Sequence, residues 1–366
     1  MAAPAPLPAT MHGVVLTAFG GPEVLHYRDD LPVPVPRAGE VLIRVAASAV
    51  NNTDINTRVG WYSKTAAKAT EDGAAAFDSA QDLDPSWGGT PMAFPRIQGA
   101  DCCGRIAAVG PGVDAARLGQ RVLVRPILRA YADYRPYACW YFGSECDGGF
   151  AQYTRVPADA AVAVHSALSD AELASFPCAY STAENLVDRA GVKADERVLV
   201  TGASGGVGSA AVQLAHRRGA HIIAVAGVDK HAAVRALGAA ECLARDADLT
   251  HALGMDSVDV VIDLVGGAQW PVLLDVLKRG GRYATSGAIA GPLVSLDLRT
   301  LYLKDLTLVG CTFQDDRIFD NLVGYIERGE IAPVVAQTFA LRDIALAQAA
   351  FGAKDFVGKI VLLAPP

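Results

Sequence analysis

The residues most clearly suited to chemistry form a glycine-rich turn at 202–208, which reads GASGGVG. An apolar, β-branched stretch at 196–201 precedes the turn, and an amphipathic helical pattern at 209–218 follows it. Glycine at 205 lets the backbone approach a pyrophosphate, and glycine at 208 lets the helix pack closely on the strand. The free N–H groups at the helix start attract phosphate. The alternative is a turn that only packs. The predicted phosphate contacts are Ala203, Ser204, Gly205, Gly206, Val207 and Gly208, with Ala203 standing where the usual pattern has glycine.

The strand after this turn indicates which nicotinamide dinucleotide fits. An acidic residue at its end would bind the ribose 2′-hydroxyl and reject a 2′-phosphate. The strand at 221–226 ends in Ala226, and Asp229 follows only three residues later. Lys230 and Arg245 could both reach a 2′-phosphate, so the sequence favours NADPH (NADP) over NADH. The alternative is that both cations are solvated, as most are.

The elements that position this turn fall into two patterns. Short strands punctuated by glycine and proline, at 12–19, 41–47, 104–110 and 121–124, predict a mostly β first domain. From about residue 169 strands and helices alternate, which is typical of a doubly wound parallel sheet in an α/β protein. The further predicted strands are 259–264, 282–286 and 307–310, with helices at 170–174, 182–190, 230–237, 270–278, 318–328 and 343–351, and a last strand at 359–363 that returns to the first domain.

Composition narrows the class of protein. The 366 residues suggest two domains, and the net charge of −7 disfavours nucleic acid as a partner. No apolar stretch is long enough to cross a membrane, and the Ala- and Pro-rich first ten residues lack the features of a secretory or transit signal. Seven cysteines without framework spacing indicate free thiols. We therefore expect a cytoplasmic protein that acts on a small-molecule substrate.

Several motifs together resemble the medium-chain dehydrogenase/reductase superfamily, nearest to its quinone-oxidoreductase-like branch. These motifs are GGPEVL at 20–25, VNNTD at 50–54, GADCCG at 99–104 with VG at 109–110, DGGFAQY at 147–153, the turn at 202–208, and GKIV at 358–361. The resemblance implies a partly open β-barrel (GroES-like) catalytic domain over 11–165 and 312–366. It also implies a Rossmann dinucleotide-binding domain over 166–311, with the nicotinamide and substrate in the cleft between them.

The resemblance also bears on metal. In zinc-dependent alcohol dehydrogenases of this superfamily, the positions matching Asn51, Ala100 and Cys178 hold the catalytic zinc. An amide is a poor zinc ligand and alanine has no donor atom, so we predict that no metal is bound. The alternative is an alcohol dehydrogenase with a rearranged site that uses Asp101 and Cys178.

Without a Lewis acid, hydride addition to a quinone or a conjugated enone is easier than ketone reduction, because the developing charge spreads over the conjugated system. We therefore predict an NADPH-dependent oxidoreductase of this kind. Asn51 is the expected hydrogen-bond donor and Tyr62 a second donor, while Asp54 is either a base or a backbone anchor. The resemblance places Tyr180 and Thr182 beside the nicotinamide. Val265, Ser286 and Lys359 complete the predicted cofactor contacts.

Three further expectations concern turnover, assembly and access. A cofactor-binding protein without turnover is the alternative from another functional class. The apolar run at 301–310 would lie at a sheet edge and pair with a second chain, which gives a homodimer that the resemblance also implies. The long segment at 63–90 lacks periodicity and follows residues that the family places at the active site. We expect it to form a mobile cover over the nicotinamide, or else an inert surface insertion.

Overall fold

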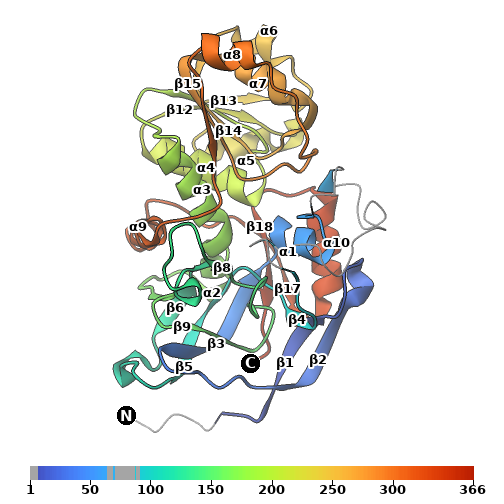
Figure 1. Ribbon diagram of the computed structural model, residues 1–366, viewed down its shortest axis with the longest axis vertical. Coiled ribbons are helices and arrows are strands. Elements are labelled where there is room, and N and C mark those ends of the chain that lie inside the picture. Colours follow the sequence, from blue (N-terminus) through green and yellow to red (C-terminus); the bar gives the residue numbers. More distant parts are fainter. Residues whose placement is uncertain (1–6, 64–68, 71–86, 88–90) are drawn as a thin grey trace.

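The chain folds into two lobes of different construction, seen in Figure 1. The computed structural model describes residues 7–63, 69–70, 87 and 91–366. The lower lobe contains the barrel strands, which are antiparallel except for one parallel pair, and the upper lobe contains a parallel sheet. Among the described residues, no helix has the length and apolarity needed to cross a membrane. All seven cysteines are described, and none forms a disulfide.

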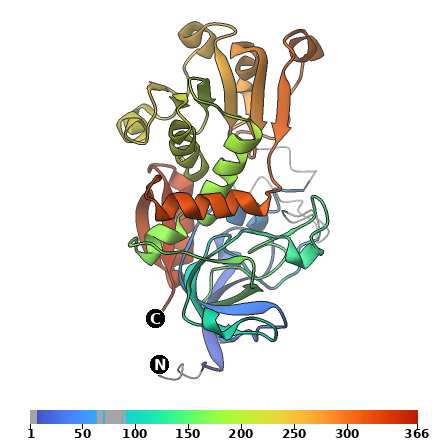
Figure 2. The same ribbon diagram turned by 90° about the vertical axis from the view of Figure 1, so that its left-hand side faces the viewer.

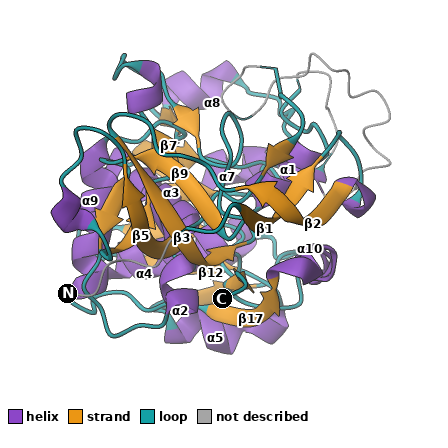
Figure 3. Ribbon diagram, turned by 90° about the horizontal axis from the view of Figure 1, so that it is seen from below, coloured by secondary structure: helices purple, strands orange, loops and turns teal. Residues whose placement is uncertain are grey.

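The lower lobe is built around strand β3 (Glu40–Ala49), which pairs with three neighbours. It runs antiparallel to β5 (Cys103–Val109) and β9 (Tyr153–Pro157), and its end pairs with β18 (Lys359–Leu363). Figure 3 shows β3, β5 and β9 side by side from below. The remaining strands of this lobe are β1 (Thr10–Leu16), β2 (Leu25–Pro32), β4 (Arg96–Ile97), β6 (Arg121–Val124), β7 (Ile127–Leu128), β8 (Trp140–Tyr141), β10 (Ala161–Ala163) and β17 (Val335–Ala340).

The upper lobe holds a six-stranded parallel sheet in the order β13-β12-β11-β14-β15-β16. This order reverses at β11, so the strands on either side of it leave a crevice at their carboxyl ends. The strands are β11 (Arg197–Val200), β12 (His221–Val225), β13 (Glu241–Leu243), β14 (Val258–Asp263), β15 (Leu277–Thr285) and β16 (Thr307–Gly310). The helices of this sheet are α4 (Gly206–Arg217), α5 (His231–Ala236), α6 (Leu249–Leu253), α7 (Trp270–Val276) and α8 (Leu298–Leu303).

Helices at the junction join the lobes through one apolar core. Helix α2 (Asp170–Ala174) leads into α3 (Pro177–Arg189), and α9 (Asp316–Glu327) packs against α3. Figure 2 shows the orange-red α9 lying across the junction. Barrel residues such as Ala47 and sheet residues such as Val200 belong to the same buried cluster. The last helices are α1 (Asn52–Arg58) and α10 (Ile344–Ala353), both in the barrel lobe.

The predicted fold class is confirmed: a GroES-like barrel lobe accompanies a parallel, doubly wound sheet. The strand predicted at 307–310 is confirmed as β16 at the edge of the sheet, and the start of the apolar run at 301–310 is helical, because α8 extends to Leu303. The predicted helix at 270–278 ends two residues early, because β15 begins at Leu277. Strand 359–363 is confirmed, and it returns to the barrel beside β3 as predicted.

Candidate active site

A cavity of about 600 Å³ lies between the two lobes. The barrel lobe contributes the segment that follows β3 and the start of β18, and the sheet lobe contributes the glycine-rich turn and the strand ends. Helix α3 lies along it with Cys178 and Thr182. The cavity therefore occupies the place where α/β folds bind ligands, at the carboxyl ends of the parallel strands.

The glycine-rich turn forms one wall of this cavity. Helix α4 begins at Gly206, and its N-cap Gly205 provides no side chain to bind the first N–H groups. A Cβ built on Gly205 would meet only the Gly202 carbonyl oxygen, at 3.5 Å, so this position faces open space. A Cβ on Gly208 would instead collide with that same carbonyl oxygen. The two glycines thus serve different needs: Gly205 leaves room for a ligand, and Gly208 allows the turn to close. An open cradle at a 12-residue helix start fits a dinucleotide pyrophosphate.

The far end of the cavity carries the two predicted cations. Lys230 and Arg245 both line it, next to Ala226 at the end of β12. The Lys230 ammonium is mostly buried and donates to the backbone oxygen of Lys354, which belongs to the other lobe. Burial lowers the pKa of Lys230, and the positive charge of Arg245 lowers it further. A second anion at this end would be stabilised by both cations.

Most of the predicted cofactor contacts line the cavity, and two do not. Ser204, Gly205, Gly206, Val207, Gly208, Lys230, Arg245, Val265, Ser286, Thr182 and Lys359 all line it. Tyr180 does not: its side chain is fully buried in the shared core, and its hydroxyl donates to the Ala332 carbonyl oxygen at 2.7 Å. Ala203 is also fully buried, with its N–H donated to Val225. On α3, Tyr180 therefore faces the core, whereas Thr182, two residues further along, faces the cavity.

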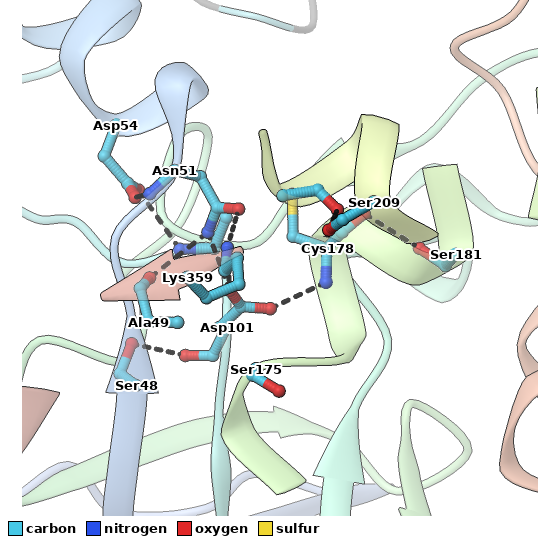
Figure 4. Close-up of polar contacts among 12 residues, drawn as sticks. Ser48, Ala49, Asn51, Asp54, Asp101, Ser175, Cys178, Ser181, Ser209 and Lys359 are labelled. Carbon is cyan, nitrogen blue, oxygen red and sulfur yellow. Dashed lines mark hydrogen bonds and ion pairs between the residues drawn. The ribbon is translucent and has the colours of Figure 1, made fainter. Parts of the chain in front are cut away.

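A buried polar cluster of Asn51, Asp101 and Lys359 lies at the barrel side of the cavity (Figure 4). The Lys359 ammonium donates to Asn51 Oδ1 and to Asp101 Oδ2, the latter at 3.0 Å. Asn51 Nδ2 donates to the same Asp101 oxygen at 2.7 Å. The other oxygen, Asp101 Oδ1, accepts the backbone N–H of Cys178 at 2.6 Å, near the start of α3. Each carboxylate oxygen is therefore hydrogen-bonded, which makes burial of this charge affordable.

Strand register brings these side chains together. Asn51 follows β3, and on one side of β3 the antiparallel register pairs Ala49 with Val361, so that Lys359 comes level with Asn51. On the other side β5 pairs Cys103 with Ala47, which brings the preceding Asp101 to the same end. The hydroxyl of Ser48 donates to the Asp101 carbonyl oxygen at 2.6 Å and fixes that segment.

Asn51 differs from its predicted role as a donor to the substrate. Its amide N–H groups go to Asp101 and, at 3.2 Å, to the Ala49 carbonyl oxygen, and its amide oxygen accepts from Lys359. An amide has two N–H donors, so none remains for a substrate. Asn51 lines the cavity, but it orients Lys359 and Asp101.

Asp54 anchors backbone, the second of the two roles foreseen for it. One of its oxygens accepts the Asn51 N–H at 2.8 Å and the other accepts the Ala100 N–H at 3.2 Å. The carboxyl group is buried and does not line the cavity. Burial raises its pKa to about 7, opposed by the Asn51 N–H bond and supported by the negative charge of Asp101.

Aromatic rings form the opposite wall. Tyr62 and Trp87 line the cavity with parallel rings 6.5 Å apart, and Trp87 stacks on Tyr141 at 4.1 Å. The Tyr62 hydroxyl donates to Thr53 Oγ1 at 3.1 Å, and burial raises its pKa to about 12. Tyr62 is thus a protonated, flat wall residue at neutral pH. The cover predicted for 63–90 falls largely on residues outside those the structure describes; of that segment, Ser63, Thr70 and Trp87 are among the described positions.

The donor set does not fit a catalytic zinc ion. Ala100 has no side-chain atom that can ligate a metal, and Asn51 Oδ1 and Asp101 Oδ2 both accept a hydrogen bond from the Lys359 ammonium. A second cation there would be repelled by this ammonium. Within the described ranges, no three His, Cys, Asp or Glu side chains gather as a metal site would require.

Comparisons with known proteins find similar chains for both lobes. Residues 37–166 match the alcohol dehydrogenase GroES-like domain, and residues 206–328 match the zinc-binding dehydrogenase family. The structure of a Sinorhizobium meliloti protein provisionally named an alcohol dehydrogenase is 46% identical, with a TM-score of 0.87 over 98% of each chain. Human quinone oxidoreductase is 27% identical over 96% of this chain and 98% of its own. The 2-octenoyl-CoA carboxylase reductase CinF, solved with NADP and 2-octenoyl-CoA, is 26% identical, with a TM-score of 0.81 over 98% of this chain and 89% of its own.

The chain belongs to the medium-chain dehydrogenase/reductase superfamily, and it is an oxidoreductase that uses a nicotinamide cofactor. Sequence reasoning placed Lys359 among the cofactor contacts and did not pair it with Asp101. No short-range signal could have done so, because 258 residues separate the two. The sequence signal that could have pointed to this pair is the alanine at position 100, where the related zinc enzymes have a metal ligand, followed directly by the acidic Asp101.

Proposed function

We propose that this protein is an NADPH-dependent reductase that adds hydride to a quinone or a conjugated enone or enoyl thioester without a metal ion. The observation that carries the proposal is a single cavity lined both by the glycine-rich turn and by Asn51 and Lys359 of the buried polar cluster. The side chains of that cluster do not fit a metal ion. A reduced nicotinamide supplies the hydride when bound. The rest of the work falls to the residues around it.

The cradle at Gly205 and Gly206 would hold the pyrophosphate and fix the depth of the nicotinamide. Thr182 and Cys178 line the cavity from α3 and limit where the ring can lie. Lys230 and Arg245 at the far end favour the extra phosphate of NADPH, which matches the absence of an acid at Ala226. The CinF complex with NADP supports this choice.

The wall of Tyr62 and Trp87 favours a flat, conjugated substrate, because parallel aromatic faces stack well on planar π systems. Quinones, enones and enoyl thioesters share this planarity and accept hydride with the charge spread over several atoms. The names of human quinone oxidoreductase and CinF support this class. Saturated ketones and aldehydes localise the charge on one oxygen and need stronger polarisation, which zinc provides in other members.

A substrate panel tests the proposal. NADPH oxidation is followed with benzoquinones and naphthoquinones, with enones and enoyl thioesters, and with matched saturated ketones and aldehydes. We expect turnover with the conjugated acceptors, at rates unchanged by a strong chelator, and no stoichiometric zinc by elemental analysis. Turnover confined to saturated carbonyls, with one zinc per chain and loss of activity on chelation, would show an alcohol dehydrogenase instead. Tight NADPH binding without any turnover would show a binding protein.

A further inference from the structure

The most unusual group in the cavity wall is the ammonium of Lys359. Its side chain is only 2% exposed and its partner Asp101 is fully buried. Burial of a charge carries a large desolvation free energy, and lysine is rarely buried to this extent unless it is paired. Lys359 lines the cavity, and its side chain packs beside the glycine-rich turn, where a Cβ on Gly206 would stand only 2.7 Å from Lys359 Cδ. The absence of a side chain at Gly206 thus leaves room for the Lys359 side chain.

The ammonium lies among the three positions that ligate zinc in related enzymes. It contacts Asn51 directly, and Asp101, its other partner, follows Ala100 and accepts the N–H of Cys178. Its charge also acts on the Cys178 thiol: burial raises the pKa of that thiol well above its usual range, and Lys359 opposes the rise. A fixed positive charge therefore stands where a metal would otherwise stand.

One N–H of this ammonium is available to a ligand. A lysine ammonium has three donors. Within the described part of the chain, Asn51 Oδ1 and Asp101 Oδ2 accept two of them. Lys359 also lines the cavity, whereas the Asn51 amide is fully engaged. Of these three side chains, Lys359 is the one with a donor left for a substrate oxygen.

We propose that the Lys359 ammonium replaces the metal ion of this site and stabilises the substrate oxygen that becomes negative during reduction. The proposal rests on the proposed function. With an enone or enoyl thioester as substrate, the hydride leaves a C–H bond of the reduced nicotinamide with both electrons and forms a C–H bond at the substrate β-carbon, and the C=C electron pair moves toward the carbonyl to give an enolate. The cofactor is oxidised and the substrate reduced by two electrons. The α-carbon then takes a proton from water, while Lys359 keeps its own. Asn51 and Asp101 are positioning residues for the ammonium.

Single-turnover reduction at saturating NADPH tests this role. Lys359→Met should slow hydride transfer about 100-fold or more, as loss of one preorganised donor does in other enzymes. Lys359→Ala should be equally slow, and ethylammonium in the buffer should restore part of its rate because it can fill the space left. Lys359→Met, which fills that space, should not respond. Lys278→Met, which removes an ammonium paired with Asp259 outside the cavity, is the matched control and should react at the parent rate.

The same experiment separates this proposal from a plain cofactor contact. If Lys359 only binds NADPH, the Lys359 variants will show a raised NADPH dissociation constant and an unchanged single-turnover rate, and that result would overturn the proposal. An absence of turnover in the parent protein would instead overturn the proposed function. Circular dichroism melts of each variant establish that the comparison is made on folded protein.

A metal-binding measurement, which needs no turnover, tests whether the Lys359 ammonium takes the place of the metal ion. Asn51→Cys with Ala100→His restores, with Cys178, three side chains able to ligate zinc or cobalt. We expect this variant to bind Co²⁺ at least tenfold more tightly when Lys359→Met is added, as read from the visible absorption of tetrahedral cobalt. Equal Co²⁺ affinity with and without Lys359 would show that the ammonium does not occupy the place of the metal.

Discussion

The carboxylate of Asp54 accepts the backbone N–H of Asn51 at 2.8 Å, so the first turn of α1 holds in place the residue that contacts Lys359. Asp54 and Asn51 form a capping box in which each satisfies a backbone N–H of the other. The buried Asp54 thus holds Asn51 in place in the cluster, although Asp54 itself does not line the cavity.

This arrangement predicts a pH-dependent stability. The pKa of Asp54 is about 7 in the folded chain, against the ordinary aspartate value of 3.8 that applies to the unfolded chain. The folded chain therefore holds a proton that the unfolded chain has lost, and this contribution is lost as pH rises through about 7. We expect unfolding free energy to fall with pH between about 5 and 7, by at most about 1.4 kcal/mol per unit from this group. Asp54→Asn cannot titrate, so urea titrations should show its stability deficit shrinking as pH rises; a constant deficit would contradict this.

The glycine-rich turn offers a matched pair of substitutions. Gly208→Ala places a methyl group against the fixed Gly202 carbonyl oxygen and should destabilise the fold by about 1–3 kcal/mol. Gly205→Ala meets only an ordinary contact, so its melting temperature should stay near that of the parent. Because its methyl group enters the cradle, its NADPH dissociation constant should rise at least tenfold. Thermal melts and fluorescence titration measure the two effects. Equal behaviour of the two variants would contradict the assigned roles.

Cofactor preference depends on the cations at the far end of the cavity. Arg245→Ala and Lys230→Ala should each weaken NADPH binding by about 1–2 kcal/mol and leave NADH binding nearly unchanged, because charge-assisted bonds to the 2′-phosphate are lost. Arg235→Ala serves as a control, since it removes an exposed cation from α5 that does not line the cavity. Equal NADPH and NADH dissociation constants in the parent protein would refute this prediction.

We propose that the chain forms a twofold dimer through the edge strand β16. This strand has no sheet partner on its outer side among the described strands, and Leu308 on it and Leu298 and Tyr302 on α8 are exposed. Covering this apolar edge would protect it from uncontrolled pairing. Light scattering at micromolar concentration should give the mass of a dimer. Leu308→Asp should give a monomer, and Leu346→Asp, a leucine on α10 that is more exposed than Leu308 (64% against 37%), should remain a dimer. A monomeric parent would end the proposal.

The sequence by itself determined the elements whose pattern is local. The turn at Gly205 and Gly208 is predictable because the strand before it and the helix after it adjoin it in the chain, so each residue's role follows from its neighbours. The terminal strand at Lys359–Leu363 is equally clear from its β-branched residues. The missing acid at Ala226 and the missing ligand at Ala100 are also visible in the sequence, because each concerns one residue type at one position.

Only the tertiary structure decided what the polar residues do. Whether the Asn51 amide is free depends on Asp101 and Lys359, which are brought to it by two of the strands that neighbour β3, β5 and β18. Likewise, Tyr180 and Thr182 lie two residues apart on α3, yet one is in the core and the other at the cavity, because helix rotation is set by what packs against it. The partners that occupy a hydrogen-bond donor are its neighbours in space, and these can be far away in the sequence. The folded chain was therefore needed to show that Lys359, and not Asn51, has a donor available.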